Sequence, residues 1–435
     1  MTTALTPAMA ARERLPRNVL AVRPLDLGAS TAALRLLEPP QLARHVDAVC
    51  DRIDVVEPQL RSLLPEPGRR QRLQREMAEL AQRYPDPSTR PPLFGALLAV
   101  KDILRADGHA TRCGSALPAE AFASHLKVEN GAVTRAKAAG ALVLGKTVTT
   151  EFACSEPGAT TNPWDPNYTP GGSSQGSAAA VSAGLAQLSL GSQTGGSTNR
   201  PGAFCGIVAL KATKDRVPAD GCVMISNTLD HVGLYANTVA SMELVASVIL
   251  NGWDTGHGTT HTDGGEVVIG IPTGPYLDKT DGAALLEFDA VIERLERAGA
   301  QVKRVPLIEH VDDLSQAHLD VMRYEAAVEN PGVHGNGPDG AGWWDSYKGL
   351  YRARTADLVT KGLNTTRVNY QAGLSAREAL QTHLREVTAA HGIDYWITPG
   401  ATGPAPMGLA STGDHILQMP WTFAGWPSLS VRTSL

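Results

Sequence analysis

Two clusters of glycine and serine residues flank an apolar run, and they are the part of the chain best suited to chemistry. The first cluster is residues 171–177 (GGSSQGS) and the second is residues 191–197 (GSQTGGS), with an Ala-, Val- and Leu-rich run between them. A flexible linker would not enclose a run that can pack in a core. Glycine permits turns with positive φ and close approach of the backbone to a ligand, and successive N–H groups in such turns bind anions. A serine in either cluster could therefore be a nucleophile facing its own oxyanion hole.

A lysine is the best general base that the chain offers to such a serine. Lys101 ends the apolar segment 93–100 (LFGALLAV), which is typical of a short buried strand. Burial can lower the pKa of a lysine until its amine is neutral near pH 7, and a neutral amine can accept a proton from a serine. The alternative is a surface lysine at a strand end. No His/Asp pair stands out as a partner for a serine in either cluster.

Two other motif matches lack the structural context that they require. Residues 140–147 (GALVLGKT) fit the phosphate-loop pattern GxxxxGK[ST], but that loop must follow a strand and precede a helix. Here a predicted helix precedes, Gly140 is expected to cap it, and residues 141–144 are expected to form a strand. Lys146 is then structural or on the surface, and nucleotide binding is a remote alternative. Residues 172–176 spell GxSxG around Ser174, but the preceding segment is polar and turn-forming, unlike the strand that a nucleophile elbow needs.

The elements that must position these residues alternate between helices and short apolar strands. Such alternation predicts an α/β fold with a mixed, largely parallel central sheet covered by helices on both faces. We expect residues 1–30 to be an irregular N-terminal arm, residues 31–90 to be a helical segment, and residues 91–435 to be one large catalytic core.

Composition excludes several classes of function. The 435 residues carry 39 Lys and Arg against 44 Asp and Glu, a net charge of −5, which argues against nucleic-acid binding. The sequence contains no run of about 18 apolar residues, so no membrane span is predicted. The N-terminus lacks a signal-peptide pattern. Five cysteines without CxxC spacing indicate a reduced, cytoplasmic protein. His257 and His261 lie in a polar segment without a third ligand, so we expect no metal and no cofactor.

At this point the chain resembles the amidase signature family. The motifs occur in the family's order: PLFGALLAVKD (92–102), AAGALVLGKTVTTEFA (138–153), TNPWDP (161–166), GGSSQGSAAAVSAGL (171–185), GSQTGGSTNRPGAFCGIVALKAT (191–213) and LDHVG (229–233). Weaker matches follow at 394–406 and 421–431, so the resemblance covers about residues 40–435. It implies the amidase signature fold, with a Ser–cis-Ser–Lys triad.

The resemblance implies a role for each member of this triad. Ser197 is the nucleophile, Ser173 is a bridging serine after a cis peptide bond, and Lys101 is the base. The backbone N–H groups of Thr194, Gly195, Gly196 and Ser197 would form the oxyanion hole.

The chain departs from the commonest form of the signature at three places. Where many members have Asp before TGGS it has Gln193, and where they have Arg two residues after the nucleophile it has Asn199. An amide pair is therefore expected in place of a charge pair. The form QTGGSxxRP is similar to malonamidase-like members, which implies that Arg200 contacts a substrate carboxylate; a structural arginine is the alternative. Ser174 and Gln193 are further candidates for substrate contact.

Family members usually continue past the position of Leu435, so the chain is either truncated or closes its sheet differently.

We therefore expect a serine amidohydrolase that cleaves a carboxylic amide C–N bond through an acyl-enzyme. Its partner would be a small-molecule amide, with no nucleic acid or membrane involved, and a homodimer is left open. The alternatives are a carbamate or ester hydrolase with the same triad, and the amidase component of a tRNA-dependent amidotransferase, which would need partner subunits.

Overall fold

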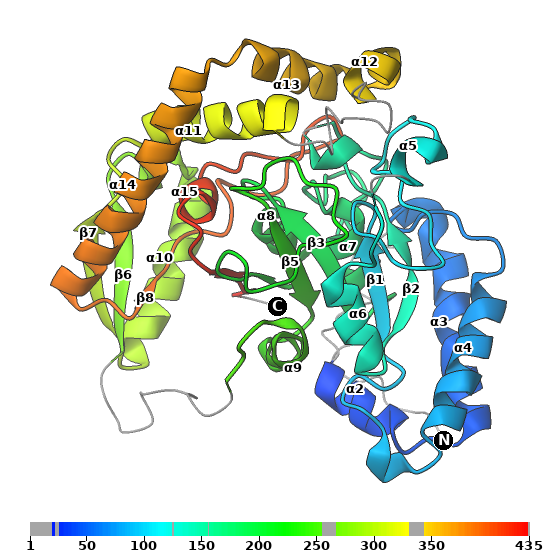
Figure 1. The fold of residues 1–435 in the computed structure, drawn as a ribbon. Helices are drawn as coiled ribbons and strands as arrows, with labels where there is room; N and C mark the ends of the chain where they lie inside the picture. Colours follow the sequence, from blue (N-terminus) through cyan, green and yellow to red (C-terminus); the bar gives the residue numbers. More distant parts are fainter. Residues whose placement is uncertain are drawn as a thin grey trace.

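The computed structural model describes residues 20–21, 26–123, 126–154, 156–254, 267–329 and 343–433. These residues form two sheets with helices packed around them (Figure 1). His257 and His261 lie outside the described residues. Within the described residues, no helix is both long enough and apolar enough to cross a lipid bilayer.

The larger sheet has the strand order β2-β1-β3-β5-β4-β9. Its strands are β1 (Leu97–Lys101), β2 (Leu142–Thr147), β3 (Leu188–Gln193), β4 (Val208–Lys211), β5 (His231–Ala236) and β9 (Ser428–Ser430). The mixed sheet is as expected, but parallel pairing is restricted to β1 with β2 and β1 with β3. The pairs β3–β5, β4–β5 and β4–β9 are antiparallel. A parallel pair needs a crossover connection, whereas residues 212–230 join β4 to β5 without a helix, so the chain turns back.

Side chains of β1 alternate between two apolar cores, one on each face of the sheet. Leu98 and Val100 belong to the core that includes residues of α6 and α9, while Leu97 and Ala99 belong to the core that includes α3, α4 and α7. Burial on both faces explains why the strand reads as an unbroken apolar run. Because the alternation has a period of two, Lys101 lies on the same face as Leu97 and Ala99, toward α7. This places its amine in a dry environment.

The helices around this sheet come from both halves of the chain. On one side Figure 1 shows α3 and α4 packed together beyond β2. The α-helices nearest the sheet are α3 (Pro39–Leu60), α4 (Arg69–Arg83), α5 (Ala119–Ala123), α6 (Gly131–Ala138), α7 (Gln175–Ser182), α8 (Asn199–Cys205) and α9 (Val239–Ile249). Short 3₁₀ turns cover Pro87–Thr89 and Glu151–Ala153.

The expected irregular arm ends earlier than residue 30. Leu27–Leu34 forms helix α2, in which the Asp26 side chain accepts a hydrogen bond from the N–H of Ala29 and so caps the first turn. Leu27 is fully buried, and its N–H donates to the Ser241 hydroxyl at 2.6 Å on α9. An N-cap and one buried apolar side chain therefore turn this part of the arm into a helix. Residues 1–19 and 22–25 lie outside the described residues.

A smaller parallel sheet follows in the second half of the chain. Its order is β7-β6-β8, with β6 (Val268–Thr273), β7 (Gln301–Pro306) and β8 (Tyr395–Trp396). Its neighbouring helices are α10 (Gly282–Arg297), α11 (Val311–Tyr324), α12 (Trp343–Tyr347), α13 (Ala353–Asn364), α14 (Arg367–His391) and α15 (Met419–Phe423), with 3₁₀ turns at Leu277–Lys279 and Lys348–Leu350 and a π-turn at Glu325–Glu329. Figure 1 shows α11 and α15 reaching from this half toward β3 and α8.

Candidate active site

Lys101 is fully buried at the carboxyl end of β1 and contacts two serine hydroxyls. Its Nζ atom is 2.7 Å from Ser173 Oγ and 2.7 Å from Ser192 Oγ. Burial lowers the pKa of this amine to about 7, because the charged form loses its hydration. The alternative of a surface lysine is therefore wrong, and a large fraction of Lys101 is neutral near pH 7.

Ser173 lies in the first glycine–serine turn, directly before helix α7. The peptide bond between Gly172 and Ser173 is cis, as the resemblance implied. The carbonyl of Ser173 accepts hydrogen bonds from the N–H of Thr150 at 3.2 Å and from the hydroxyl of Thr149 at 3.2 Å. The turn is thus held from its carbonyl side, and the Ser173 hydroxyl is left to Lys101.

Ser174 and Ser192 join this turn to strand β3. The Ser174 hydroxyl donates to the carbonyl of Ser192 and accepts from its N–H, both at 3.1 Å. Ser174 is fully buried. These two bonds hold the Ser174 hydroxyl against β3, so Ser174 positions the first turn, and its contact with substrate stays a prediction. Ser192 was missed from sequence, although its position beside Gln193 in the second cluster was a usable signal.

The second cluster is part strand and part turn. Residues 191–193 are the end of β3, and Thr194 to Ser197 form a turn before helix α8. Ser197 is partly exposed, whereas its neighbours in the turn are buried. Within the described residues, no hydrogen bond is recorded from the Ser197 hydroxyl or from the N–H groups of Gly195, Gly196 and Ser197. These groups are therefore available to a ligand.

Gln193 and Asn199 form the expected amide pair. Gln193 Nε2 donates to Asn199 Oδ1 at 2.9 Å, and Gln193 Oε1 accepts from the N–H groups of Thr198 at 2.8 Å and Asn199 at 2.9 Å. Gln193 is fully buried and also donates to the Thr422 hydroxyl at 2.9 Å. Both ends of its amide are therefore occupied by protein partners, so Gln193 holds the turn in shape, and its contact with substrate stays a prediction.

Arg200 is buried next to the cis peptide. Its Nη2 atom donates to the carbonyl of Gly172 at 2.7 Å and to the Thr412 hydroxyl at 3.1 Å. Its Nε and Nη1 atoms are buried without a partner in the described protein. Burial lowers the pKa of Arg200 to about 10, which still leaves it protonated at neutral pH. The guanidinium thus supports the first turn through Nη2, while Nε and Nη1 can still donate to a ligand.

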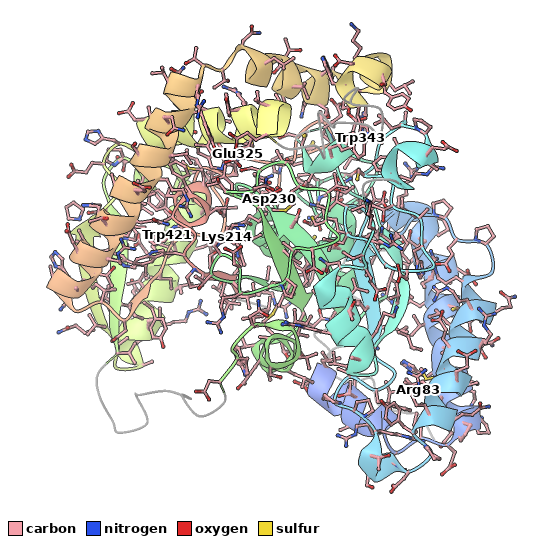
Figure 2. The ribbon with its side chains drawn as sticks, in the orientation of Figure 1. Arg83, Lys214, Asp230, Glu325, Trp343 and Trp421 are labelled. Atoms are coloured by element: carbon pink, nitrogen blue, oxygen red, sulfur yellow. The ribbon has the colours of Figure 1, made fainter. Side chains whose placement is uncertain are left out.

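Three residues around the second turn, Asp230, His318 and His415, were not predicted from the sequence as parts of the site. The Thr194 hydroxyl donates to Asp230 Oδ1 at 2.5 Å, and the Thr194 carbonyl accepts from His318 Nε2 at 2.8 Å. A Cβ atom at Gly195 or Gly196 would meet His415 at 2.7 Å, which explains why glycine is needed at both positions. In Figure 2 Asp230 lies in the middle of the molecule, close to Lys214, whose amine donates to the Asp230 carbonyl at 3.0 Å. Of the three, only Asp230 lies within a family motif, LDHVG.

Residues 140–147 do not form a phosphate loop. Gly140, with φ of 92°, follows helix α6, and Leu142–Thr147 is strand β2. Lys146 is buried, with Nζ 3.2 Å from Asp102 Oδ1 and 2.7 Å from the Thr111 hydroxyl. Its amine is thus satisfied inside the protein. The expectation of a structural role is confirmed and that of a surface position is wrong.

The site combines a buried amine, serine hydroxyls and a glycine turn. The amine contacts a serine that follows a cis peptide, and a partly exposed serine lies in a glycine turn whose N–H groups have no hydrogen-bond partner among the described residues. The family model described as Amidase matches residues 44–435. The chain therefore belongs to the amidase family.

Known relatives and structures agree with this family. The chain is similar to the glutamyl-tRNA(Gln) amidotransferase A-subunit of Natronomonas pharaonis, at 36% identity over 301 residues, which are 63% of this chain and 70% of that protein. Its fold matches a crystal structure of an amidase with a TM-score of 0.76 at 26% identity, covering 94% of this chain and 92% of the other. It also matches native peptide amidase from Stenotrophomonas maltophilia with a TM-score of 0.72 at 26% identity, covering 93% and 89%.

The match to these amidotransferase proteins covers only part of their length. The corresponding protein from Synechococcus sp. (strain RCC307) is 39% identical over 232 residues, which are 52% of this chain and 46% of that protein. The chain thus spans between about half and 70% of the length of the two relatives.

Proposed function

We propose that the chain is a serine amidohydrolase that cleaves a small carboxylic amide through an acyl-enzyme. The observation that carries the proposal is the 2.7 Å contact between the buried amine of Lys101 and the hydroxyl of Ser173. A neutral amine in that place can take the Ser173 proton, and Ser173 can in turn take the proton of Ser197. A serine and lysine couple of this kind needs no histidine.

In the proposed reaction these groups act in sequence. Ser197 Oγ attacks the amide carbonyl carbon while its proton passes through Ser173 to Lys101. The oxyanion that forms accepts hydrogen bonds from turn N–H groups, and one such donor is worth about 3–4 kcal/mol. The C–N bond then breaks as the proton returns through Ser173 to the leaving amine. Water attacks the Ser197 ester by the same route and releases the acid.

Arg200 supports a preference for substrates with a carboxylate. Two of its donor atoms, Nε and Nη1, are buried without a partner in the described protein, and leaving such donors unpaired is costly. Substrate carboxylate oxygens are suitable acceptors for a guanidinium. Dicarboxylic monoamides should therefore be better substrates than neutral amides of the same length. Arg200→Met should abolish this preference; a uniform loss on both substrates would instead assign Arg200 to support of the Gly172 carbonyl alone.

Labelling of Ser197 tests the central proposal. A fluorophosphonate probe should label the wild-type chain and should fail on Ser197→Ala, and Lys101→Met should slow labelling strongly. The matched control is Ser192→Ala, which removes a hydroxyl from the other side of Lys101 and leaves the nucleophile in place. Wild-type activity in Ser197→Ala would refute the mechanism. A panel of aryl anilides, primary amides, monoamides, esters and carbamates then separates amidase from ester or carbamate hydrolase.

A second candidate is the amidase component of a tRNA-dependent amidotransferase, favoured by the 36% identity to such a protein. In that case Ser197 would attack the amide of glutamine, and the ammonia would be passed to a partner protein. The test is to purify the chain by itself and measure amide turnover with and without added amidotransferase partners. Turnover that the partners do not raise would exclude this candidate. A nucleotide-binding role for residues 140–147 predicts ATP binding in calorimetry, and its absence would end that alternative.

A further inference from the structure

The carbonyl groups of the turn before Ser197 are held from outside by side chains of the second half of the chain. The Thr194 carbonyl accepts from His318 Nε2 at 2.8 Å, from helix α11. The Gly195 carbonyl accepts from the Thr422 hydroxyl at 2.7 Å, from helix α15. Both donors are buried. The turn is thus anchored by two elements more than 100 residues away in sequence.

Holding a carbonyl also aims the next N–H group. A trans peptide unit is planar, and its C=O and N–H bonds point in opposite directions. Within the described residues only the bond between Gly172 and Ser173 is cis. The bond from His318 therefore directs the Gly195 N–H away from α11, and the bond from Thr422 directs the Gly196 N–H away from α15. Figure 1 shows α11 and α15 on one side of β3, with β1 and α7 on the other.

These anchors matter because glycine alone does not fix a peptide plane. Two consecutive glycines have wide φ/ψ freedom, and no hydrogen bond is recorded, in the described part of the chain, from the N–H of Gly195 or Gly196. Without the outer bonds, either plane could rotate and turn its N–H away from the reacting carbonyl. A preorganised donor avoids that reorganisation during the reaction.

His318 and Thr422 both have a proton that they can donate to a turn carbonyl. A carbonyl can only accept, so His318 carries its proton on Nε2, while its Nδ1 is buried without a partner among the described residues. Burial lowers the pKa of His318 to about 4, which keeps the ring neutral at neutral pH. The Thr422 hydroxyl accepts from Gln193 Nε2 at 2.9 Å and donates over a shorter distance to Gly195 than to the Gln418 carbonyl, 2.7 against 3.1 Å.

We propose that His318 and Thr422 are positioning residues that aim the N–H groups of Gly195 and Gly196 at the substrate oxyanion. The inference rests on the proposed serine amidohydrolase function. It assigns to the second half of the chain an influence on the rate of bond cleavage that acts through the carbonyl groups of the turn.

The test is a pair of substitutions at each anchor. Thr422→Val removes the donor and keeps the shape, whereas Thr422→Ser keeps the donor; His318→Leu and His318→Gln form the equivalent pair. We expect Thr422→Val to lower kcat by about tenfold to a hundredfold with KM within about twofold of wild type, since losing a donor outright costs about a hundredfold to a thousandfold. Thr422→Ser should retain most of the activity.

Binding of a transition-state analogue distinguishes a change in the orientation of the N–H groups from a loss of fold stability. A peptidyl boronic acid, which forms a tetrahedral adduct with a serine, should bind Thr422→Val more weakly by about the same factor as the loss in kcat/KM. Thr388→Val makes the same atomic change in α14, where the hydroxyl donates to the Leu384 carbonyl. It should lower the melting temperature without changing kcat or boronate affinity.

The outcomes distinguish this inference from the function beneath it. Wild-type kcat and boronate affinity in Thr422→Val would overturn the inference while leaving the amidase proposal intact. A rise in KM at unchanged kcat would overturn it as well. If the wild-type chain is neither labelled by a fluorophosphonate nor active on any amide or ester, the proposed function itself fails. Should His318→Leu not fold, the comparison of Thr422→Val with Thr422→Ser decides alone.

Discussion

Lys101 gives a pH dependence that can be worked out from its surroundings. The amine is fully buried, and burial lowers its pKa to about 7. Only the neutral amine can accept the proton, so kcat/KM should follow the neutral fraction. That fraction is about 9% at pH 6 and about 90% at pH 8 for a pKa near 7. We therefore predict about a tenfold rise in kcat/KM between pH 6 and pH 8 and a plateau above about pH 8.

An ordinary lysine would behave differently. With a pKa near 10.4, less than about 1% would be neutral at pH 8, and the rate would keep rising about tenfold per pH unit until pH 10. The assay is steady-state kcat/KM for an anilide between pH 5.5 and 10, because this quantity reports groups of the free enzyme. A rise that continues unbroken through pH 9 would refute a lowered pKa for Lys101.

Ser192 provides the perturbation that ties the profile to Lys101. Its hydroxyl accepts a hydrogen bond from the Lys101 amine at 2.7 Å, which stabilises the charged form. Ser192→Ala should therefore move the acid limb of the profile to lower pH. A limb that stays in place, or moves to higher pH, would assign the titration to another group.

Three further predictions concern the support of the site. Gln193→Leu leaves two backbone N–H groups unpaired, each worth about 1–3 kcal/mol, so its melting temperature should fall by several degrees in differential scanning fluorimetry. The unfolded chain protonates His318 near pH 6.5 but the folded chain only near pH 4, so urea unfolding should show stability falling from pH 6.5 to 4, less steeply in His318→Gln. Lys146→Met should cost about 3–5 kcal/mol by urea unfolding, because it leaves the buried Asp102 carboxylate without its counter-ion. Adding Asp102→Asn should recover much of this loss, and additive losses would contradict the pairing.

The parts of the site that could be predicted from sequence are each marked by a local pattern of neighbouring residues. Lys101 follows an apolar run that only a buried strand explains, and the two glycine–serine clusters mark turns at Ser173 and Ser197. The amide pair of Gln193 and Asn199 was predictable because two substitutions occur together six residues apart, and the structure confirms it.

The contributions that could not be predicted come from distant segments. His318 contacts Thr194 across 124 positions, and Thr422 contacts Gly195 across 227. A single histidine on a helix gives no periodic or spacing signal toward a turn that it meets only after folding. A mixed sheet was predicted, but which strands run antiparallel was not, since the direction of β5 depends on a long helix-free connection. Partners of that kind are set by tertiary packing.

The amide pair has an electrostatic consequence for the approach of substrates. Gln193 and Asn199 are uncharged, so this pair adds no fixed charge beside Ser197. Arg200 donates to a carbonyl and a hydroxyl, and among the described residues the exposed carboxylate of Asp414 opposes its charge without a direct ion pair. With Lys101 largely neutral above pH 7, a positive potential from Arg200 remains near the turn. Anionic substrates would then be drawn in by long-range attraction that salt screens over about 8–10 Å, while neutral amides would arrive at a rate independent of ionic strength.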